Sequence, residues 1–302
     1  MKTLVVGAAV IDMILVIDKL PKSGEDVFAK ENKTTVGGCA YNVASTLRNL
    51  NCEHDLCVPV GNGTYGEIIK SELVKEGYPI LIEDASKDNG YCICVVEDDG
   101  ERTFITIPGV ESDFKESLFK NIDMNQYDKV YIAGYQTCGE AGMAVSKWLK
   151  TIPCEVVFAP GPVICQIDEQ VINDIWDLHP IVHLNDKELL DYTKTNSIDD
   201  GLKKLYKRVG NMIIVTCGAD GAAYYNGGQT HHIAGVPAKV VDTIGAGDSH
   251  IGAILGALSK GMNIDEAIEF ANNVSAQVVS VQGAIIKREQ FLEKFGEVKW
   301  KK

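Results

Sequence analysis

The sequence has little positive charge. Its 302 residues include 29 lysines and arginines against 42 aspartates and glutamates, so the formal net charge is −13. A surface with this balance repels phosphate backbones and anionic membranes, so we expect neither nucleic acid nor a membrane as a partner. A local pocket for a nucleotide remains compatible with that total charge.

The sequence also lacks a C-x-x-C motif, and no apolar run reaches about 18 residues. The nine cysteines are an odd number spread over the chain, and we expect them to be reduced and mostly buried. No basic segment with a small-residue cleavage site stands at the amino end, which predicts a cytoplasmic protein. No linker or low-complexity tract divides the chain, so residues 1–302 are expected to form a single domain.

Apolar runs separated by helix-length segments dominate the chain. Gly37 and Gly38 precede a stretch whose apolar residues have three-and-four spacing, which predicts a helix that begins at the glycine pair. The expected strands cover residues 3–17, where a central strand is predicted, and then 129–134, 154–160, 181–185 and 212–216. This alternation is typical of a doubly wound, Rossmann-like, mostly parallel α/β sheet.

Two β-rich stretches interrupt the alternation. Residues 91–107 contain two strand-like runs around Asp98, Asp99 and Gly100, which predicts a hairpin. Together with residues 14–35, this hairpin is expected to form a small separate sheet that covers the site as a lid. Exposed strands of such a lid can pair between subunits, which favours a homodimer.

The clearest candidate for chemistry is the run from Val241 to Asp248. The small residues Gly245, Ala246 and Gly247 precede an apolar helix, and backbone N–H groups at such a helix start can converge on an anion. From the pattern alone, Asp248 is equally well explained as a plain helix cap. No G-x-x-x-x-G-K-[ST] motif is present, which excludes a P-loop enzyme.

The run from Asp242 to Asp248 resembles the carboxy-terminal signature of the ribokinase (PfkB) family of carbohydrate kinases. Further stretches resemble family motifs in the same order along the chain: the glycine pair with Asn42, Val60 to Glu67, Asn185 to Glu188, Thr216 to Gly221, and Gly283 with Ala284. The resemblance implies a ribokinase-like fold and ATP-dependent phosphorylation of a hydroxyl on a sugar or sugar-like molecule. The combined pattern is similar to a little-characterised bacterial sugar-kinase subgroup.

The same resemblance implies roles for individual residues. Asp248 would take the proton from the acceptor hydroxyl, while the amides of Gly245, Ala246 and Gly247 stabilise the transferring phosphoryl group. The residues that would bind the sugar are Asp12, Gly37, Gly38 and Asn42. Those that would border the nucleotide are Asn185, Thr216, Gly218, Gly221 and Asn272.

Metal ions are also implied by the resemblance. Asn185 and Glu188 would organise Mg²⁺ through retained waters, although their spacing alone favours a strand-end Asn and a solvated helix acid. Relatives often bind a monovalent cation such as K⁺ near the anion hole. The matching region here comprises Asp242, Ile244, Val278 and Gly283, but Ile285 to Lys287 stand where a small hydroxyl residue is expected.

Three residues depart from the family pattern or are ambiguous. Cys39 stands where ribokinase-like members have a sugar-contacting lysine, which weakens the assignment to ribose. His250 is a single helical histidine, a kind that is more often packed than catalytic. Arg102 shares a strand face with Phe104 and Thr106, so it points over the sugar or forms a cross-strand surface charge.

Three alternatives stay open from the sequence. The acceptor of such a kinase could be a nucleoside. The chain could instead be a non-catalytic sugar-binding protein on the same fold, although such a protein need not retain Asp248. Val6 to Ala9 after the opening strand also suggest a dinucleotide-binding domain, but no full G-x-G-x-x-G follows.

Overall fold

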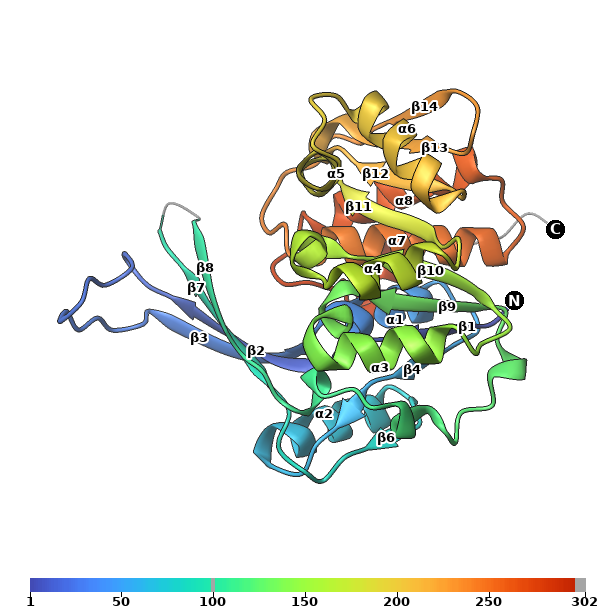
Figure 1. Ribbon diagram of the computed structural model, residues 1–302. Coiled ribbons are helices and arrows are strands. Elements are labelled where there is room, and N and C mark those ends of the chain that lie inside the picture. The colour runs from blue at the N-terminus through green and yellow to red at the C-terminus, as the bar shows by residue number, and fades with distance from the viewer. Residues whose placement is uncertain (99–100, 297–302) are drawn as a thin grey trace.

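The computed structural model describes residues 1–98 and 101–296, and it places them in a body and a projecting sheet (Figure 1). The sheet of the body has the strand order β14-β13-β12-β11-β10-β9-β1-β4. Neighbours from β12 to β4 run parallel, whereas β13 and β14 are antiparallel to their neighbours. The strands are β1 Thr3–Val6, β4 His54–Cys57, β9 Lys129–Ala133, β10 Glu155–Ala159, β11 Ile181–Asn185, β12 Ile213–Thr216, β13 Gly221–Tyr225 and β14 Thr230–Ala234. The predicted mostly parallel α/β sheet is confirmed.

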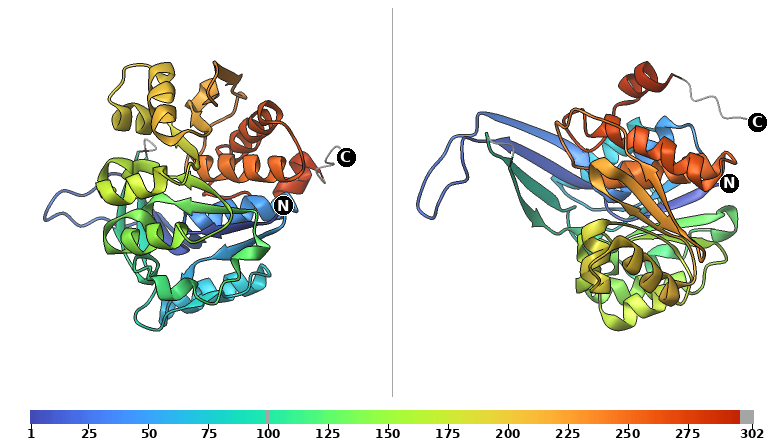
Figure 2. Two further views of the ribbon diagram at one scale, coloured as in Figure 1. Left: turned by 45° about the vertical axis from the view of Figure 1, so that its right-hand side comes forward. Right: turned by 90° about the horizontal axis from the view of Figure 1, so that it is seen from above.

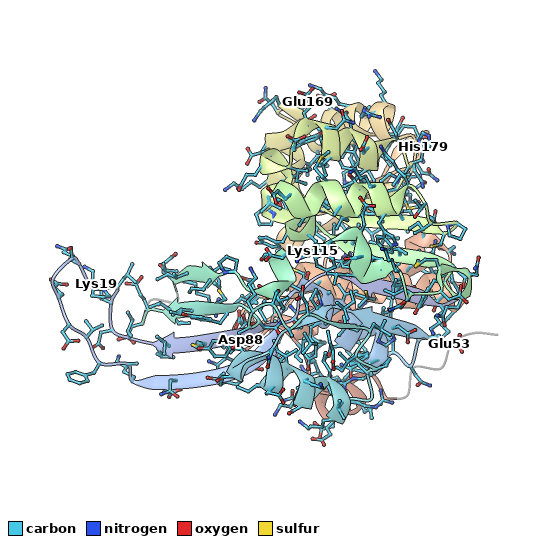
Figure 3. The ribbon with its side chains drawn as sticks, turned by 60° about the horizontal axis from the view of Figure 1, so that its bottom comes forward. Lys19, Glu53, Asp88, Lys115, Glu169 and His179 are labelled. Carbon is cyan, nitrogen blue, oxygen red and sulfur yellow. The ribbon has the colours of Figure 1, made fainter. Side chains whose placement is uncertain are left out.

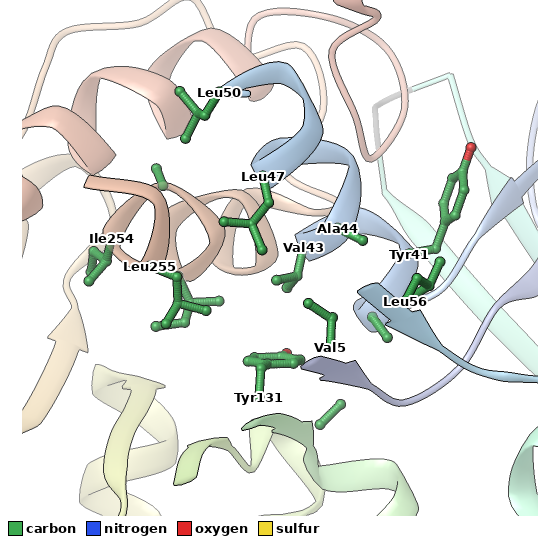
Figure 4. Packing of buried hydrophobic residues seen from close by; sticks show 14 of the residues in the cluster. Val5, Tyr41, Val43, Ala44, Leu47, Leu50, Leu56, Tyr131, Ile254 and Leu255 are labelled. Carbon is green, nitrogen blue, oxygen red and sulfur yellow. The ribbon is translucent and has the colours of Figure 1, made fainter. Parts of the chain in front are cut away.

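Helices cover both faces of this sheet because alternate strand residues point to opposite faces. Val5, Tyr131 and Val157 share one core with α1, α2, α7, α8 and α9, whereas Leu4 and Ile132 share a second core with α3, α4, α5 and α6. Figure 4 shows the first core, where side chains of α1 and α7 meet Val5 and Tyr131. The helices are α1 Cys39–Asn49, α2 Thr64–Lys75, α3 Gly139–Leu149, α4 Glu169–Trp176, α5 Asp186–Thr193, α6 Ile198–Val209, α7 Ala246–Ser259, α8 Ile264–Val278 and α9 Arg288–Phe295.

The connections include short 3₁₀ turns and one small pair of strands. The turns are η1 Val110–Ser112, η2 Glu116–Phe119, η3 Met124–Gln126, η4 Gly134–Thr137, η5 Gly161–Gln166 and η6 Gly218–Asp220. The pair consists of β5 Pro59–Val60 and β6 Ile82–Glu83, which run parallel. Within the described residues, no helix combines the length and the apolar character needed to cross a membrane.

The projecting sheet has the order β3-β2-β7-β8, and we call these four strands the lid. They are β2 Val10–Val16, β3 Glu31–Gly37, β7 Tyr91–Val96 and β8 Arg102–Ile107. The lid extends away from the body, as Figure 1 and the right view of Figure 2 show. The separate small sheet and its hairpin are therefore confirmed, while Asp99 and Gly100 of the predicted turn lie outside the described residues.

The prediction of one central strand over residues 3–17 is wrong. That stretch forms β1 in the body and β2 in the lid, and Asp12 lies inside β2. The strand breaks at Gly7, where the chain passes α1 so closely that an added Cβ would lie 2.8 Å from the Cβ of Ala40. β1 is also not central, because only β4 separates it from the sheet edge.

Side-chain hydrogen bonds fix the root of the lid to the body. The Asp88 carboxylate accepts the backbone N–H groups of Tyr65 (3.1 Å) and Gly66 (2.7 Å) at the start of α2. The neighbouring Asn89 donates to the carbonyl of Ala9, directly before β2 (3.2 Å). Figure 3 shows Asp88 at this root and Lys19 near the far end of the lid. The lid thus extends from a fixed base.

All nine cysteines lie in the described residues and are free, as expected for reduced thiols. The expectation that most are buried is wrong: Cys52, Cys57 and Cys94 are buried, Cys165 is exposed, and the others are half-buried. The half-buried group includes Cys39, which lies at the start of α1. Its surroundings belong to the site described next.

Candidate active site

At the start of α7, several backbone N–H groups have no acceptor among the described residues. Gly245 caps this helix with φ +74°, and an added Cβ would collide with the carbonyl of Ala284. The Ala246 N–H donates to the carbonyl of Thr243 (3.3 Å). Among the described residues, no acceptor is found for the N–H groups of Gly245, Gly247 and Asp248. The nest available to an anion therefore comprises these three amides rather than the predicted set that included Ala246.

Asp248, in the first turn of α7, is held from the side of α1. Asn42 Nδ2 donates to its Oδ2 (2.9 Å), and Cys39 lies beside the carboxylate. Burial raises the pKa of Asp248 to about 6, although the interactions with Asn42 and Cys39 oppose the rise and the charge of Glu188 adds to it. A carboxyl with this pKa is mostly ionised at neutral pH yet binds a proton more readily than an ordinary carboxylate, which suits general base catalysis.

Asp12 brings a second carboxylate to the same place from the lid. Its side chain packs so closely on Gly37 that an added Cβ there would collide with it. Burial, and then the charge of Asp248, raise the pKa of Asp12 to about 6. The next residue, Gly38, caps α1 with φ +103° and lies against the carbonyl of Ala8, so both positions of the glycine pair exclude a side chain.

Two cavities border this pair of carboxylates. One of about 470 Å³ is lined by Asp248 and by the predicted site residues Gly245, Ala246, Gly247, Asn185, Glu188, Thr216 and Gly218, and also by Cys39. The other, of about 950 Å³, lies between the lid and the carboxy-terminal segment and is lined by Asp12, Phe104, Ile244 and Gly283, among others. The larger cavity lies beneath the lid, whereas the smaller one contains the amide nest.

Asn185 and Glu188 form a reciprocal capping box at the start of α5. Asn185 Oδ1 accepts the Glu188 N–H (2.8 Å), and Glu188 Oε2 accepts the Asn185 N–H (2.9 Å). Asn185 Nδ2 also donates to Glu188 Oε1 (2.9 Å), so the amide of Asn185 serves the helix end. Burial raises the pKa of Glu188. Glu188 lines the smaller cavity, and each of its oxygens retains acceptor capacity that a hydrated cation could use.

The predicted nucleotide-bordering residues divide into two groups. Thr216, at the end of β12, and Gly218, with φ +57°, line the smaller cavity. Gly221 instead makes a tight turn with φ +98°, where an added Cβ would collide with the carbonyl of Ile233. Asn272 is buried in α8, and neither it nor Gly221 lines that cavity in the described part of the chain.

Asn272 ends a buried hydrogen-bond chain that sequence reasoning missed. Its Nδ2 donates to the carbonyls of Ile233 (3.3 Å) and Ala234 (3.0 Å), so its Oδ1 accepts from His250 Nε2 (3.0 Å). His250 Nδ1 must then accept from His183 Nε2 (2.9 Å). Burial lowers the pKa of both histidines, that of His250 to about 4, so both are neutral. The chain joins β11, α7, α8 and β14, which confirms that His250 is a packed residue.

Asp242 is a buried connector between two loops. Its Oδ1 accepts the Ile244 N–H (3.0 Å) and its Oδ2 accepts the Gly283 N–H (2.9 Å). α8 ends at Val278. The carbonyl of the next residue, Val279, accepts the N–H of Asp242 (3.1 Å). The residues predicted around a monovalent cation are thus close together.

The positive charge beside Asp242 comes from the lid. Arg102 Nη2 lies 3.3 Å from Asp242 Oδ1 and 3.4 Å from the carbonyl oxygen of Val241. The Arg102 guanidinium therefore points at the loop that leads into α7. A metal ion beside the same carboxylate oxygen would face this guanidinium, so the residues present do not fit a monovalent cation.

Comparisons with known proteins agree over nearly the whole chain. A family model described as "pfkB family carbohydrate kinase" matches residues 1–290. The chain is 34% identical over 285 residues to the "Uncharacterized sugar kinase YegV" of Escherichia coli strain K12, covering 93% of this chain and 89% of that protein.

Solved structures show the same fold. The ribokinase of Thermotoga maritima superposes with a TM-score of 0.83 at 26% identity, covering 97% of this chain and 98% of that one. The ribokinase of Arabidopsis thaliana, complexed with ribose and ATP, superposes with a TM-score of 0.79 at 22% identity, covering 96% of this chain and 97% of that chain. These likenesses identify a ribokinase-like fold with a separate small sheet.

Proposed function

Because the chain belongs to the pfkB family and is a carbohydrate kinase, we propose that it transfers a phosphoryl group from ATP to a hydroxyl of a sugar or sugar-like molecule, with Asp248 as the base. The observation that carries the proposal is the position of Asp248 beside N–H groups that lack acceptors among the described residues. A base and an anion-binding nest at one helix end are the two parts that phosphoryl transfer to a hydroxyl requires.

The base is Asp248, and its neighbours orient it. Asn42 donates to the carboxylate, so its orientation is restricted before a substrate arrives. The acceptor hydroxyl gives its proton to Asp248 as its oxygen attacks phosphorus. The N–H groups of Gly245, Gly247 and Asp248 stabilise the negative charge that spreads over the transferring group.

The sugar lies between the lid and α1. The Asp12 carboxylate accepts hydrogen bonds from sugar hydroxyls, and the buried Asn42 Oδ1, which has no donor among the described residues, accepts another. Gly37 leaves room for the Asp12 carboxylate, because an added Cβ would collide with it, and Gly38 lets α1 begin against the carbonyl of Ala8. Cys39, which lies beside Asp248, adds a small and weakly polar wall.

The nucleotide occupies the smaller cavity, bordered by Thr216 and Gly218. Mg²⁺ fits there only through water and substrate, because the described residues contain no group of three metal-ligating side chains. Glu188 would hold the hydrated ion, which neutralises phosphate charge when bound. The presence of ATP in the Arabidopsis ribokinase structure supports this choice of donor.

An ADP-release assay over ribose, ketoses, sugar acids, nucleosides and phosphosugars tests the proposal. We expect release above the ATP-only background with at least one sugar. Release with nucleosides alone would instead identify a nucleoside kinase. Binding of a sugar without release for any acceptor would support the sugar-binding protein and overturn the proposal.

A further inference from the structure

The lid delivers a positive charge to the loop that precedes the amide nest. Arg102 is the first residue of β8, and its register partner Val96 is the last residue of β7. Its side chain crosses to the body and pairs with Asp242 Oδ1 at 3.3 Å. The side chain of Asp242 is only 3% exposed and that of Arg102 19%, so solvent screens this ion pair weakly.

Asp242 determines how the loop approaches α7. Its two oxygens accept the N–H groups of Ile244 and Gly283, so the carboxylate joins the loop to the carboxy-terminal segment. Three residues later, Gly245 lies against the carbonyl of Ala284, the neighbour of Gly283. A buried carboxylate is unfavourable without a positive partner, so the loop geometry depends on a cation at Asp242.

Arg102 suits this task because its planar guanidinium presents several N–H donors in a fixed geometry. One nitrogen, Nη2, contacts both the Asp242 carboxylate and the carbonyl of Val241. A side chain attached to the lid also reaches Asp242 only while the lid lies over the body. The neutralisation of Asp242 is therefore linked to the position of the lid, which also carries Asp12.

We propose that Arg102 is a tethered cation that holds Asp242 and positions the 242–247 loop, so that the kinase needs no monovalent metal ion. Arg102 acts through Asp242 and is a positioning residue, not a catalytic one. The proposal rests on the proposed function only in taking this loop to be the one that binds phosphate.

The activity test compares three variants in buffers of equal ionic strength that contain tetramethylammonium, K⁺ or guanidinium at non-denaturing concentration. We expect the wild-type enzyme to turn over equally in all three. Arg102→Ala should lose about 10- to 100-fold in turnover in tetramethylammonium, as for loss of a charge that positions an anion site, and should regain part of it with K⁺ or guanidinium. Arg102→Lys should retain more activity than Arg102→Ala, since it keeps the charge.

Lys30→Ala is the matched control. Lys30 is a cation of the same projecting segment, but it pairs with Asp18 and Asp98 and not with Asp242. We expect its loss to leave turnover and the response to salt unchanged. A similar loss and a similar rescue in this variant would show that any lid charge has the effect and would overturn the specific role of Arg102.

Amide hydrogen exchange provides a readout without substrate. Exchange of peptides that cover residues 241–247 and 283 should accelerate in Arg102→Ala and slow again with K⁺ or guanidinium. Stimulation of the wild-type enzyme several-fold by K⁺, or exchange in Arg102→Ala that is unchanged, would overturn the inference. If the wild-type protein phosphorylates no acceptor, the proposed function fails, but the exchange result still decides the role of Arg102.

Discussion

Asp248→Asn separates catalysis from helix capping at the start of α7. Asn keeps the shape and can still accept from Asn42, whose Nδ2 lies 2.9 Å from the carboxylate, but it cannot take a proton. Proton transfer to a positioned base typically contributes about 10²- to 10⁴-fold. Single-turnover phosphoryl transfer should therefore slow by that factor while binding of ATP and sugar persists.

The same substitution should stabilise the protein at alkaline pH. Burial raises the pKa of Asp248 from 3.8 to about 6, so the folded state binds this proton more tightly than the unfolded state. The ionised side chain therefore destabilises the fold fully above pH 6, by about 3 kcal/mol for a shift of about two units, and not at all below pH 3.8. Asp248→Asn should melt several degrees above the wild type at about pH 8, and the gap should close as the pH falls through about 6 to 4.

Asp168→Asn is the control for a change of charge at a helix end. Asp168 caps α4, its side chain accepts the Gln170 N–H (2.8 Å), and it is exposed and outside the site. Asn is an equally good cap, so this variant should keep both turnover and melting temperature. Near-wild-type turnover of Asp248→Asn, with equal melting temperatures at about pH 8, would refute the catalytic role and leave only a cap.

Three further outcomes are expected. Asp12→Ala should raise the Michaelis constant for the sugar, because a buried acceptor for hydroxyls is lost, and should leave the Michaelis constant for ATP nearly unchanged. An unaltered Michaelis constant for the sugar in steady-state kinetics would contradict this. Turnover of the wild-type enzyme should fall as the pH drops through about 6, because the base must be ionised, so a pH–rate profile that stays flat to about pH 5 would argue against Asp248. Light scattering should show a dimer of the wild-type protein. The side chain of Phe28, beside the lid, is 90% exposed, and Phe28→Asp should convert the dimer to a monomer. A wild-type monomer at micromolar concentration would contradict a dimer formed through the lid.

Local rules account for what could be predicted from the sequence. The helix after the glycine pair, the hairpin and the alternation of strands and helices each depend on residues within about ten positions of one another. The same kind of rule could have identified the capping box, since an Asn with a Glu three residues later is one of its forms. The break at Gly7 was hidden because apolar residues continue on both sides, in two different sheets.

Contacts across long stretches of sequence could not be predicted in this way. Asn42 and Asp248 are 206 positions apart, and Arg102 is 139 positions from Val241. The sequence pattern of β8 was compatible with two roles for Arg102, a sugar contact or a surface charge. Only the folded chain shows that it lies beside Asp242. The family resemblance assigned Asn42 and Asp248 to one site, and the folded chain places them in contact. The resemblance could not indicate the ion pair between Arg102 and Asp242.

Two interactions that cross from the lid to the body act in opposite directions. Asp12 lies near Asp248, and the two like charges disfavour a closed lid once both carboxyls are ionised above about pH 6. The attraction between Arg102 and Asp242 favours closure. Sugar hydroxyls between the two carboxylates would relieve the first interaction without changing the second. A bound sugar should therefore stabilise the closed position of the lid, in which Arg102 already contacts the loop that receives the phosphoryl group.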